Sequence, residues 1–144
     1  MASNKSPRRR TREFLIQGLY QAQVGGQDAA AIQVQAEGVQ GFDKVDREMY
    51  DALLSDTLAN REALVADLSV YIDRPWHEVS PIERSILLLG ACELKLHLET
   101  PYRVIINEAI ELAKIYGGTD GHKFVNGVLD KLAAVLRATE LGRA

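Results

Sequence analysis

The chain has 144 residues, of which 47% are hydrophobic and 26% are charged, and this balance is typical of one soluble globular domain. No run of apolar residues approaches the roughly 18 that a membrane span requires, and no apolar signal segment follows the basic N-terminus. Cys92 is the only cysteine, which excludes an intramolecular disulfide and a thiolate metal cluster and favours the reducing cytoplasm.

The charges are distributed unevenly along the chain. The net charge is −3, yet five of the 17 lysines and arginines lie within residues 1–12, where no aspartate or glutamate occurs. The rest of the chain is therefore strongly acidic. A basic arm on an acidic body predicts one localised site for a polyanion, and the acidic body suits a basic partner.

Helical periodicity runs through almost the whole sequence, and no alternating β-branched segment predicts a strand. The first helix is predicted to begin near Thr11 and to end at Gly25. A second helix is predicted over about residues 28–39, and a third begins near Asp43. Asn60 is predicted to separate the third helix from a fourth helical segment.

A hinge is predicted at residues 74–79, where Pro75 interrupts any helix. The helix that follows has the strongest start signature in the chain, with Ser80 as N-cap, a proline in the first position and Glu83 closing a capping box. This helix is apolar on nearly all sides, which predicts a place in the middle of a bundle.

Two further helices complete the predicted all-α fold of about six or seven helices. One begins with Thr100 as cap and ends near Gly117, and the last covers about residues 121–137. We predict a basic N-terminal arm over residues 1–12 and a single all-α domain over residues 13–144, with packed lobes at about 13–73 and 80–137.

The arginine run is the first candidate site and consists of Arg8, Arg9, Arg10 and Arg12. The planar guanidinium group suits phosphate and also stacks on unpaired bases. If about four phosphates are neutralised, the logarithm of the affinity falls with the logarithm of salt with a slope near −3. The alternative is a solvated tail, and the concentration of positive charge in one place favours the polyanion site.

A second candidate site is the glycine-rich turn at residues 117–121 and the helix start that follows it. Free backbone N–H groups at a helix start can bind an anion. Lys123 adds positive charge, and the rings of His122 and Phe124 could stack on bases. The alternative is a plain helix connector with Phe124 at the edge of the core, and the pattern by itself favours the connector.

Neither a metal site nor a catalytic site is predicted. The three histidines, His77, His97 and His122, share no ligand spacing, and the sequence contains no Walker loop, dinucleotide fingerprint or nucleophile elbow. We therefore expect no enzymatic activity, no cofactor and no metal. The charged hinge is a candidate protein-docking surface that includes Arg74, with a capped linker as the alternative.

Three blocks of sequence resemble the NusB family of bacterial transcription antitermination factors. They are RRRTREFLIQGLY at residues 8–20, INEAIELAKIYG at 106–117 and HKFVNGVLDK at 122–131. The resemblance covers essentially the whole chain and is weakest at residues 26–45. It implies an all-α fold of two three-helix bundles, and neither catalysis nor a cofactor.

The resemblance also implies a function in transcription. Family members bind the single-stranded boxA element of nascent ribosomal-operon RNA together with NusE, a small-subunit ribosomal protein. With other Nus factors they act on RNA polymerase, which then reads through terminators. Three possibilities stay open: a homodimer, a stand-alone RNA-binding domain related to those of ribosomal-RNA methyltransferases, and a helical protein-interaction module with an incidental basic tail.

Site residues follow from the resemblance position by position. RNA contacts are implied for Arg8, Arg9, Arg10, Arg12, Phe14, Tyr20, Asp120, His122, Lys123, Phe124 and Asn126. Docking of NusE is implied for Glu78, Glu83 and Arg84, to which the hinge pattern adds Arg74.

Overall fold

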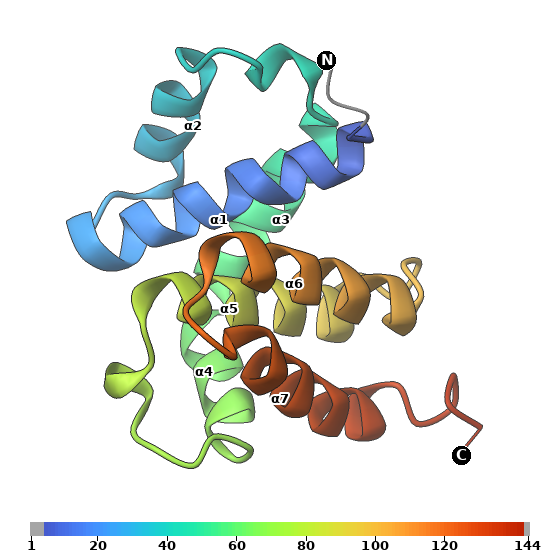
Figure 1. Ribbon diagram of the computed structural model, residues 1–144. Helices are drawn as coiled ribbons and strands as arrows, with labels where there is room; N and C mark the ends of the chain where they lie inside the picture. The colour runs from blue at the N-terminus through green and yellow to red at the C-terminus, as the bar shows by residue number, and fades with distance from the viewer. Residues whose placement is uncertain (1–4, 143–144) are drawn as a thin grey trace.

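The computed structural model describes residues 5–142, and these residues form an all-α fold, as predicted (Figure 1). Residues 1–4 of the predicted arm lie outside the described part. The helices are α1 (Pro7–Gly25), α2 (Ala29–Glu37), α3 (Arg47–Ala59), α4 (Arg61–Ser69), α5 (Pro81–Leu96), α6 (Tyr102–Tyr116) and α7 (Gly121–Leu136), with two short 3₁₀ helices, η1 (Phe42–Lys44) and η2 (Trp76–Glu78).

Helix α1 begins at Pro7, and the predicted start near Thr11 was wrong. The side chain of Ser6 accepts a hydrogen bond from the backbone N–H of Arg9 (3.1 Å), and Pro7 takes the first helical position. A serine cap followed by proline is a strong start signal, which the polar arginine run obscures because it carries no apolar face. Residues 7–12 are therefore the first turns of a long helix rather than a separate arm.

Helix α5 lies at the centre of the fold and packs against α1, α3, α4, α6 and α7 (Figure 1). Every residue from Ser85 to Leu94 is buried, which confirms the prediction drawn from its apolar surface. Helices α1, α2 and α3 pack together on one side of α5, and α6 and α7 pack together on the other.

Helix α4 packs against α5 and α7, so it belongs with the C-terminal helices. The sequence placed it in the N-terminal lobe, with the division at residues 74–79. The chain instead passes from the N-terminal to the C-terminal group of helices at Asn60, which ends α3 and precedes α4. The buried Leu64 and Leu68 then face the C-terminal helices, and η2 is a surface connection within that set.

Two predicted caps differ in the structure because residues distant in sequence supply the partners. Ser80 accepts from the backbone N–H of Glu83 (3.2 Å) as predicted, but the carboxylate of Glu83 accepts from the backbone N–H of Gly118 (3.2 Å) and does not close a capping box. The first turn of α6 is capped by Glu140, whose carboxylate accepts from the N–H of Tyr102 (2.9 Å), and not by Thr100.

A buried ion pair joins α1 to α5. The guanidinium of Arg12 donates to both carboxylate oxygens of Glu93, at 2.9 and 2.7 Å, and both side chains are 2% exposed. Burial by itself lowers the pKa of Arg12, but the hydrogen bonds and charge of Glu93 outweigh burial, so that the pKa is raised and the guanidinium stays charged.

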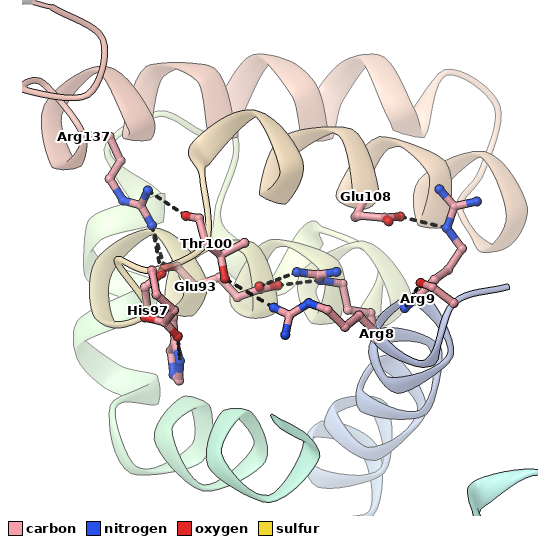
Figure 2. Close-up of polar contacts among 10 residues, drawn as sticks. Arg8, Arg9, Glu93, His97, Thr100, Glu108 and Arg137 are labelled. Atoms are coloured by element: carbon pink, nitrogen blue, oxygen red, sulfur yellow. Dashed lines mark hydrogen bonds and ion pairs between the residues drawn. The ribbon is translucent and has the colours of Figure 1, made fainter. Parts of the chain in front are cut away.

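Arg137 closes the C-terminal end of α5 from the other side. Its guanidinium donates at 2.8 to 3.1 Å to four backbone carbonyl oxygens, those of Glu93, Leu94, His97 and Thr100 (Figure 2). It also pairs with Glu140 at 2.6 Å. The last carbonyls of a helix lack intrahelical partners, so one buried arginine satisfies the end of α5 and fixes the loop that leads into α6.

The Arg12–Glu93 pair gives a first prediction. Arg12→Met leaves Glu93 buried without its partner, and the free energy of unfolding should fall by about 3–5 kcal/mol in chemical denaturation. Arg9→Met is the matched control, because its ion pair is partly exposed and should contribute less than about 1 kcal/mol. The double variant Arg12→Met/Glu93→Met should regain much of the loss; strictly additive losses would contradict the pairing.

Two helical glycines give a second prediction, because alanine should lower the stability of the protein at one position and raise it at the other. A Cβ on Gly90 would lie 2.8 Å from Cδ1 of the fully buried Leu129, so Gly90→Ala should destabilise the protein by about 1–3 kcal/mol. A Cβ on Gly127 meets nothing within 4 Å, so Gly127→Ala should stabilise by about 0.5–1 kcal/mol. Thermal unfolding measures both, and equal stabilisation would show that Leu129 relaxes without cost.

Candidate nucleic-acid interface

The basic residues of the interface lie on the first turns of α1, where three arginines reach the surface. Nη2 of Arg8 donates to Oγ1 of Thr100 at 3.4 Å, and Nε of Arg9 lies 3.0 Å from a carboxylate oxygen of Glu108 on α6 (Figure 2). Neither Arg8 nor Arg10 forms an ion pair with any described residue. These two guanidinium groups are available for phosphate.

Arg12 is not part of this exposed set. Its side chain is 2% exposed and held by Glu93, so the prediction that it binds RNA is wrong for the folded structure. The physical reason is the helix itself, because a basic run wound into a helix sends some side chains inward. With Arg12 removed from the count, Arg8, Arg9 and Arg10 can neutralise about three phosphates and the expected salt slope falls to about −2.

Glu13 links the arginine-rich end of α1 to the C-terminal end of α6. Its carboxylate accepts from Nζ of Lys5 (2.7 Å) and from the hydroxyl of Tyr116 (3.2 Å). Burial, together with the charge of Glu13, raises the pKa of Tyr116, so the phenol stays protonated. The turn that follows Tyr116 therefore lies on the same α1–α6 side of the molecule as the arginines.

The two aromatic residues predicted on α1 have different surroundings. Phe14 is half-buried and packs edge-on against Phe42, at 5.1 Å between ring centroids, and Phe42 in turn packs against the buried Tyr50. Phe14 is thus held at the edge of the core with part of its ring accessible, and its contact with RNA stays a prediction. Tyr20 is 38% exposed and keeps an accessible ring.

The glycine-rich turn between α6 and α7 is held by residues of the hinge region. Glu83 binds the backbone N–H of Gly118, and the guanidinium of Arg74 lies 4.4 Å from the ring centroid of the half-buried Phe124. The carboxylate of Glu83 thus occupies the turn at which the sequence predicted an anion site. Residues predicted for RNA and for protein docking therefore meet at one place.

The remaining predicted residues surround this turn. Asp120 has a left-handed backbone (φ 62°), and its carboxylate lies 3.4 Å from Nζ of the exposed Lys123. His122 and Asn126 are half-buried on the first turns of α7. Glu78 is exposed in η2, whereas Arg84 is half-buried and its Nε has no hydrogen-bond partner among the described residues.

Sequence reasoning missed four residues that organise the interface: Glu13, Glu93, Glu108 and Arg137. Glu93 and Arg137 are buried charged residues, whose partners lie 81 and about 40 positions away. Amphipathic periodicity carries no signal for such pairs, because it reports only which face of a helix is apolar. The one signal in the sequence was Glu93 itself, because a glutamate within the otherwise apolar middle of α5 indicates a buried charge that needs a partner.

The described residues hold no group of three or more histidine, cysteine or acidic side chains suited to a metal ion. Within the same part of the chain, no helix has the length and hydropathy of a membrane span. Cys92 is buried, and burial raises the pKa of its thiol to about 12, so it is not a nucleophile at neutral pH. Fold and surface together define a small helical protein with a cationic helix end.

Comparison with known proteins identifies the family to which this small helical protein belongs. The NusB family profile matches residues 9–134. Transcription antitermination protein NusB of Dechloromonas aromatica is 56% identical over 140 residues (97% of this chain and 86% of that protein), and that of Aromatoleum aromaticum is 58% identical over 139 residues (96% of each). The chain belongs to the NusB family of transcription antitermination proteins.

Solved structures agree on the fold. A structure of T. maritima NusB superposes with a TM-score of 0.82 at 29% sequence identity and covers 96% of this chain and 99% of that one. A chain from a complex of the antitermination factors NusB and NusE with dsRNA superposes with a TM-score of 0.75 at 21% identity, covering 88% of this chain and 96% of that one. At 21% identity, the similarity to the chain from this complex shows a shared fold.

The role of Glu83 in the turn gives a third prediction. Glu83→Ala removes the acceptor of the Gly118 N–H, and a hydrogen bond to a charged group slows amide exchange, so exchange at Gly118 should accelerate by about fivefold or more in NMR measurements. Glu78→Ala is the control, because this nearby exposed glutamate should leave the rate unchanged. Unchanged protection in Glu83→Ala would show that the turn is held by other contacts.

Proposed function

We propose that this protein binds the single-stranded boxA element of nascent ribosomal-operon RNA through the first turns of α1, together with NusE, and thereby supports read-through by RNA polymerase. The observation that carries the proposal is the group formed by the exposed Arg8 and Arg9 and the half-buried Arg10 on a protein whose remaining charge is acidic. Phosphate contacts from such a group supply salt-dependent affinity for a nucleic acid.

Family membership supports RNA and NusE as the partners. The relatives are named transcription antitermination proteins, and the NusB of the solved complex was captured with NusE and dsRNA. In our proposal the RNA continues from the arginines along the α1–α6 side to Tyr20 and the turn residues Asp120, His122, Lys123 and Asn126. The rings and amide groups there would contact unpaired bases.

In the same proposal NusE docks near η2, where Glu78 is exposed and Arg74, Glu83 and Arg84 are neighbours in sequence. An acidic body attracts a basic ribosomal protein and speeds their association. Other Nus factors and RNA polymerase would join through this assembly in the cytoplasm. The protein acts by binding, without a catalytic step of its own.

Fluorescence anisotropy tests the proposal directly. Labelled boxA RNA should bind more tightly than a scrambled RNA, and NusE should tighten boxA binding, since coupling between two ligands is reciprocal. Binding that prefers boxA but ignores NusE would favour a stand-alone RNA-binding domain. Equal and weak binding of both RNAs in the presence of NusE would favour a protein-interaction module.

Substitution of the arginines gives the fourth prediction. Arg8→Ala/Arg10→Ala should weaken boxA binding and reduce the magnitude of the salt slope by about 1.4, because each single-strand phosphate contact contributes about 0.7. Lys131→Ala, an exposed cation on α7, is the matched control and should leave both quantities unchanged. A salt slope that does not move in the double variant would remove α1 from the interface.

A further inference from the structure

A cavity of about 390 Å³ opens beside Arg8, between the start of α1, the face of α3 and the loop from α5 to α6. One wall is apolar and comes from α3, with Met49, Ala52 and Leu53. Such a volume accommodates a planar heterocycle, because ligand pockets in proteins begin at roughly 300 Å³. Of the residues that line this cavity, the proposed function described so far uses only Arg8.

The floor and the opposite wall of the cavity are fixed. Glu93 lies at the floor with both oxygens bound to Arg12, and the imidazole of His97 is held between Asp56 (2.8 Å) and Glu99 (3.3 Å). Arg137 binds the backbone carbonyls of His97 and Thr100, so the loop that forms this wall is anchored (Figure 2). The cavity is therefore formed before any ligand arrives.

Three carboxylates around the cavity form no ion pair with an arginine or lysine among the described residues: Asp46, which accepts from the backbone N–H of Met49, Glu48, and Glu99, on which the charge of Arg8 acts from a distance. They disfavour a phosphate inside the cavity and offer hydrogen-bond acceptors only. The pKa of Glu99 is lowered, first by its own backbone N–H, then by the hydrogen bond and charge of His97 and by the charge of Arg8, so this carboxylate is ionised at neutral pH. The described residues contain no cluster suited to a metal ion, so the carboxylates match a ligand that presents hydrogen-bond donors.

Among the four RNA bases, guanine matches this lining best. Its N1–H and N2–H₂ groups are adjacent donors that a single carboxylate can accept together. In cytosine and adenine the amino group lies beside a ring nitrogen acceptor, and in uracil the N–H lies between two carbonyl groups. A carboxylate would be repelled by those acceptors, so the cavity discriminates among bases through their donor patterns.

Arg8 connects the cavity to the RNA backbone. It lies at the rim, and its hydrogen bond to Thr100 is long at 3.4 Å, so little is lost when the guanidinium turns to a phosphate. A nucleotide whose phosphate is bound by Arg8 thus has its base beside the cavity mouth.

We propose that the cavity between α1, α3 and the α5–α6 loop is a guanine-binding subsite for single-stranded RNA, with Arg8 on the adjoining phosphate, Met49 and His97 flanking the base and the surrounding carboxylates accepting from its N1–H and N2–H₂ groups. This inference rests on the proposed RNA-binding function. It assigns to the protein itself a base preference that phosphate contacts from an arginine-rich helix cannot supply.

The test compares a short labelled oligouridine with the same RNA carrying one internal guanosine or inosine, by fluorescence anisotropy. The guanosine should tighten binding by about fivefold to a hundredfold, as bidentate base contacts do, and inosine, which lacks the N2 amino group, should recover only part of this gain. Ala52→Trp, which fills the cavity, should abolish the guanosine preference. Ala59→Trp, an exposed position of the same helix outside the cavity, should retain it.

Glu48→Gln/Glu99→Gln provides a second variant, because it preserves side-chain size and should reduce the preference while thermal unfolding confirms an intact fold. Equal binding of the three RNAs by the unmodified protein, or a preference that survives in Ala52→Trp, would overturn this inference and leave the proposed function standing. Failure to bind any RNA would overturn both. Loss of NusE binding in Ala52→Trp without any base preference would assign the cavity to a basic side chain of the protein partner instead.

Discussion

The buried ion pair between Arg12 and Glu93 fixes the rotation of α1 about its own axis, and the presentation of the other arginines at the start of α1 depends on it. Successive residues of an α-helix are separated by about 100°. With Arg12 turned toward α5, Arg8, one turn earlier, reaches Thr100 in the loop between α5 and α6, and Arg9 reaches Glu108 on α6. Arg12 is thus buried in the core, and its burial sets the directions in which the other arginines of the run point.

Glu93 is the point at which both ends of the fold meet. Its carboxylate binds Arg12 near the N-terminus, and its backbone carbonyl accepts from Arg137 near the C-terminus. Removing either arginine would leave buried polar groups without partners, which costs more than the pair contributes when intact. This doubly anchored end of α5 also forms the fixed wall of the cavity beside Arg8, so stability and the candidate base-binding site share the same residues.

Carboxylates set the limits of the basic surface. Glu108 pairs with Arg9, Glu13 binds Lys5 and Tyr116, and Glu83 occupies the turn before α7. Each holds a cation, a hydroxyl or an N–H group in place before a ligand arrives. A phosphate that replaces such a carboxylate must compete with it, which lowers nonspecific affinity. Discrimination among RNAs then depends on base contacts, such as those that we propose for the cavity beside Arg8.

The sequence by itself determined the all-α class, the central place of α5, the Ser80 cap and the family, because these depend on periodicity, on contacts within one helical turn or on motifs along the chain. Only the tertiary structure decided that Arg12 is buried, that Phe14 packs on Phe42, that Glu83 holds Gly118 and that α4 joins the C-terminal helices. These outcomes depend on partners far away in sequence; Arg12 and Glu93 are 81 positions apart. A local pattern states that a side chain is charged, and only the fold supplies the opposite charge that allows it to be buried.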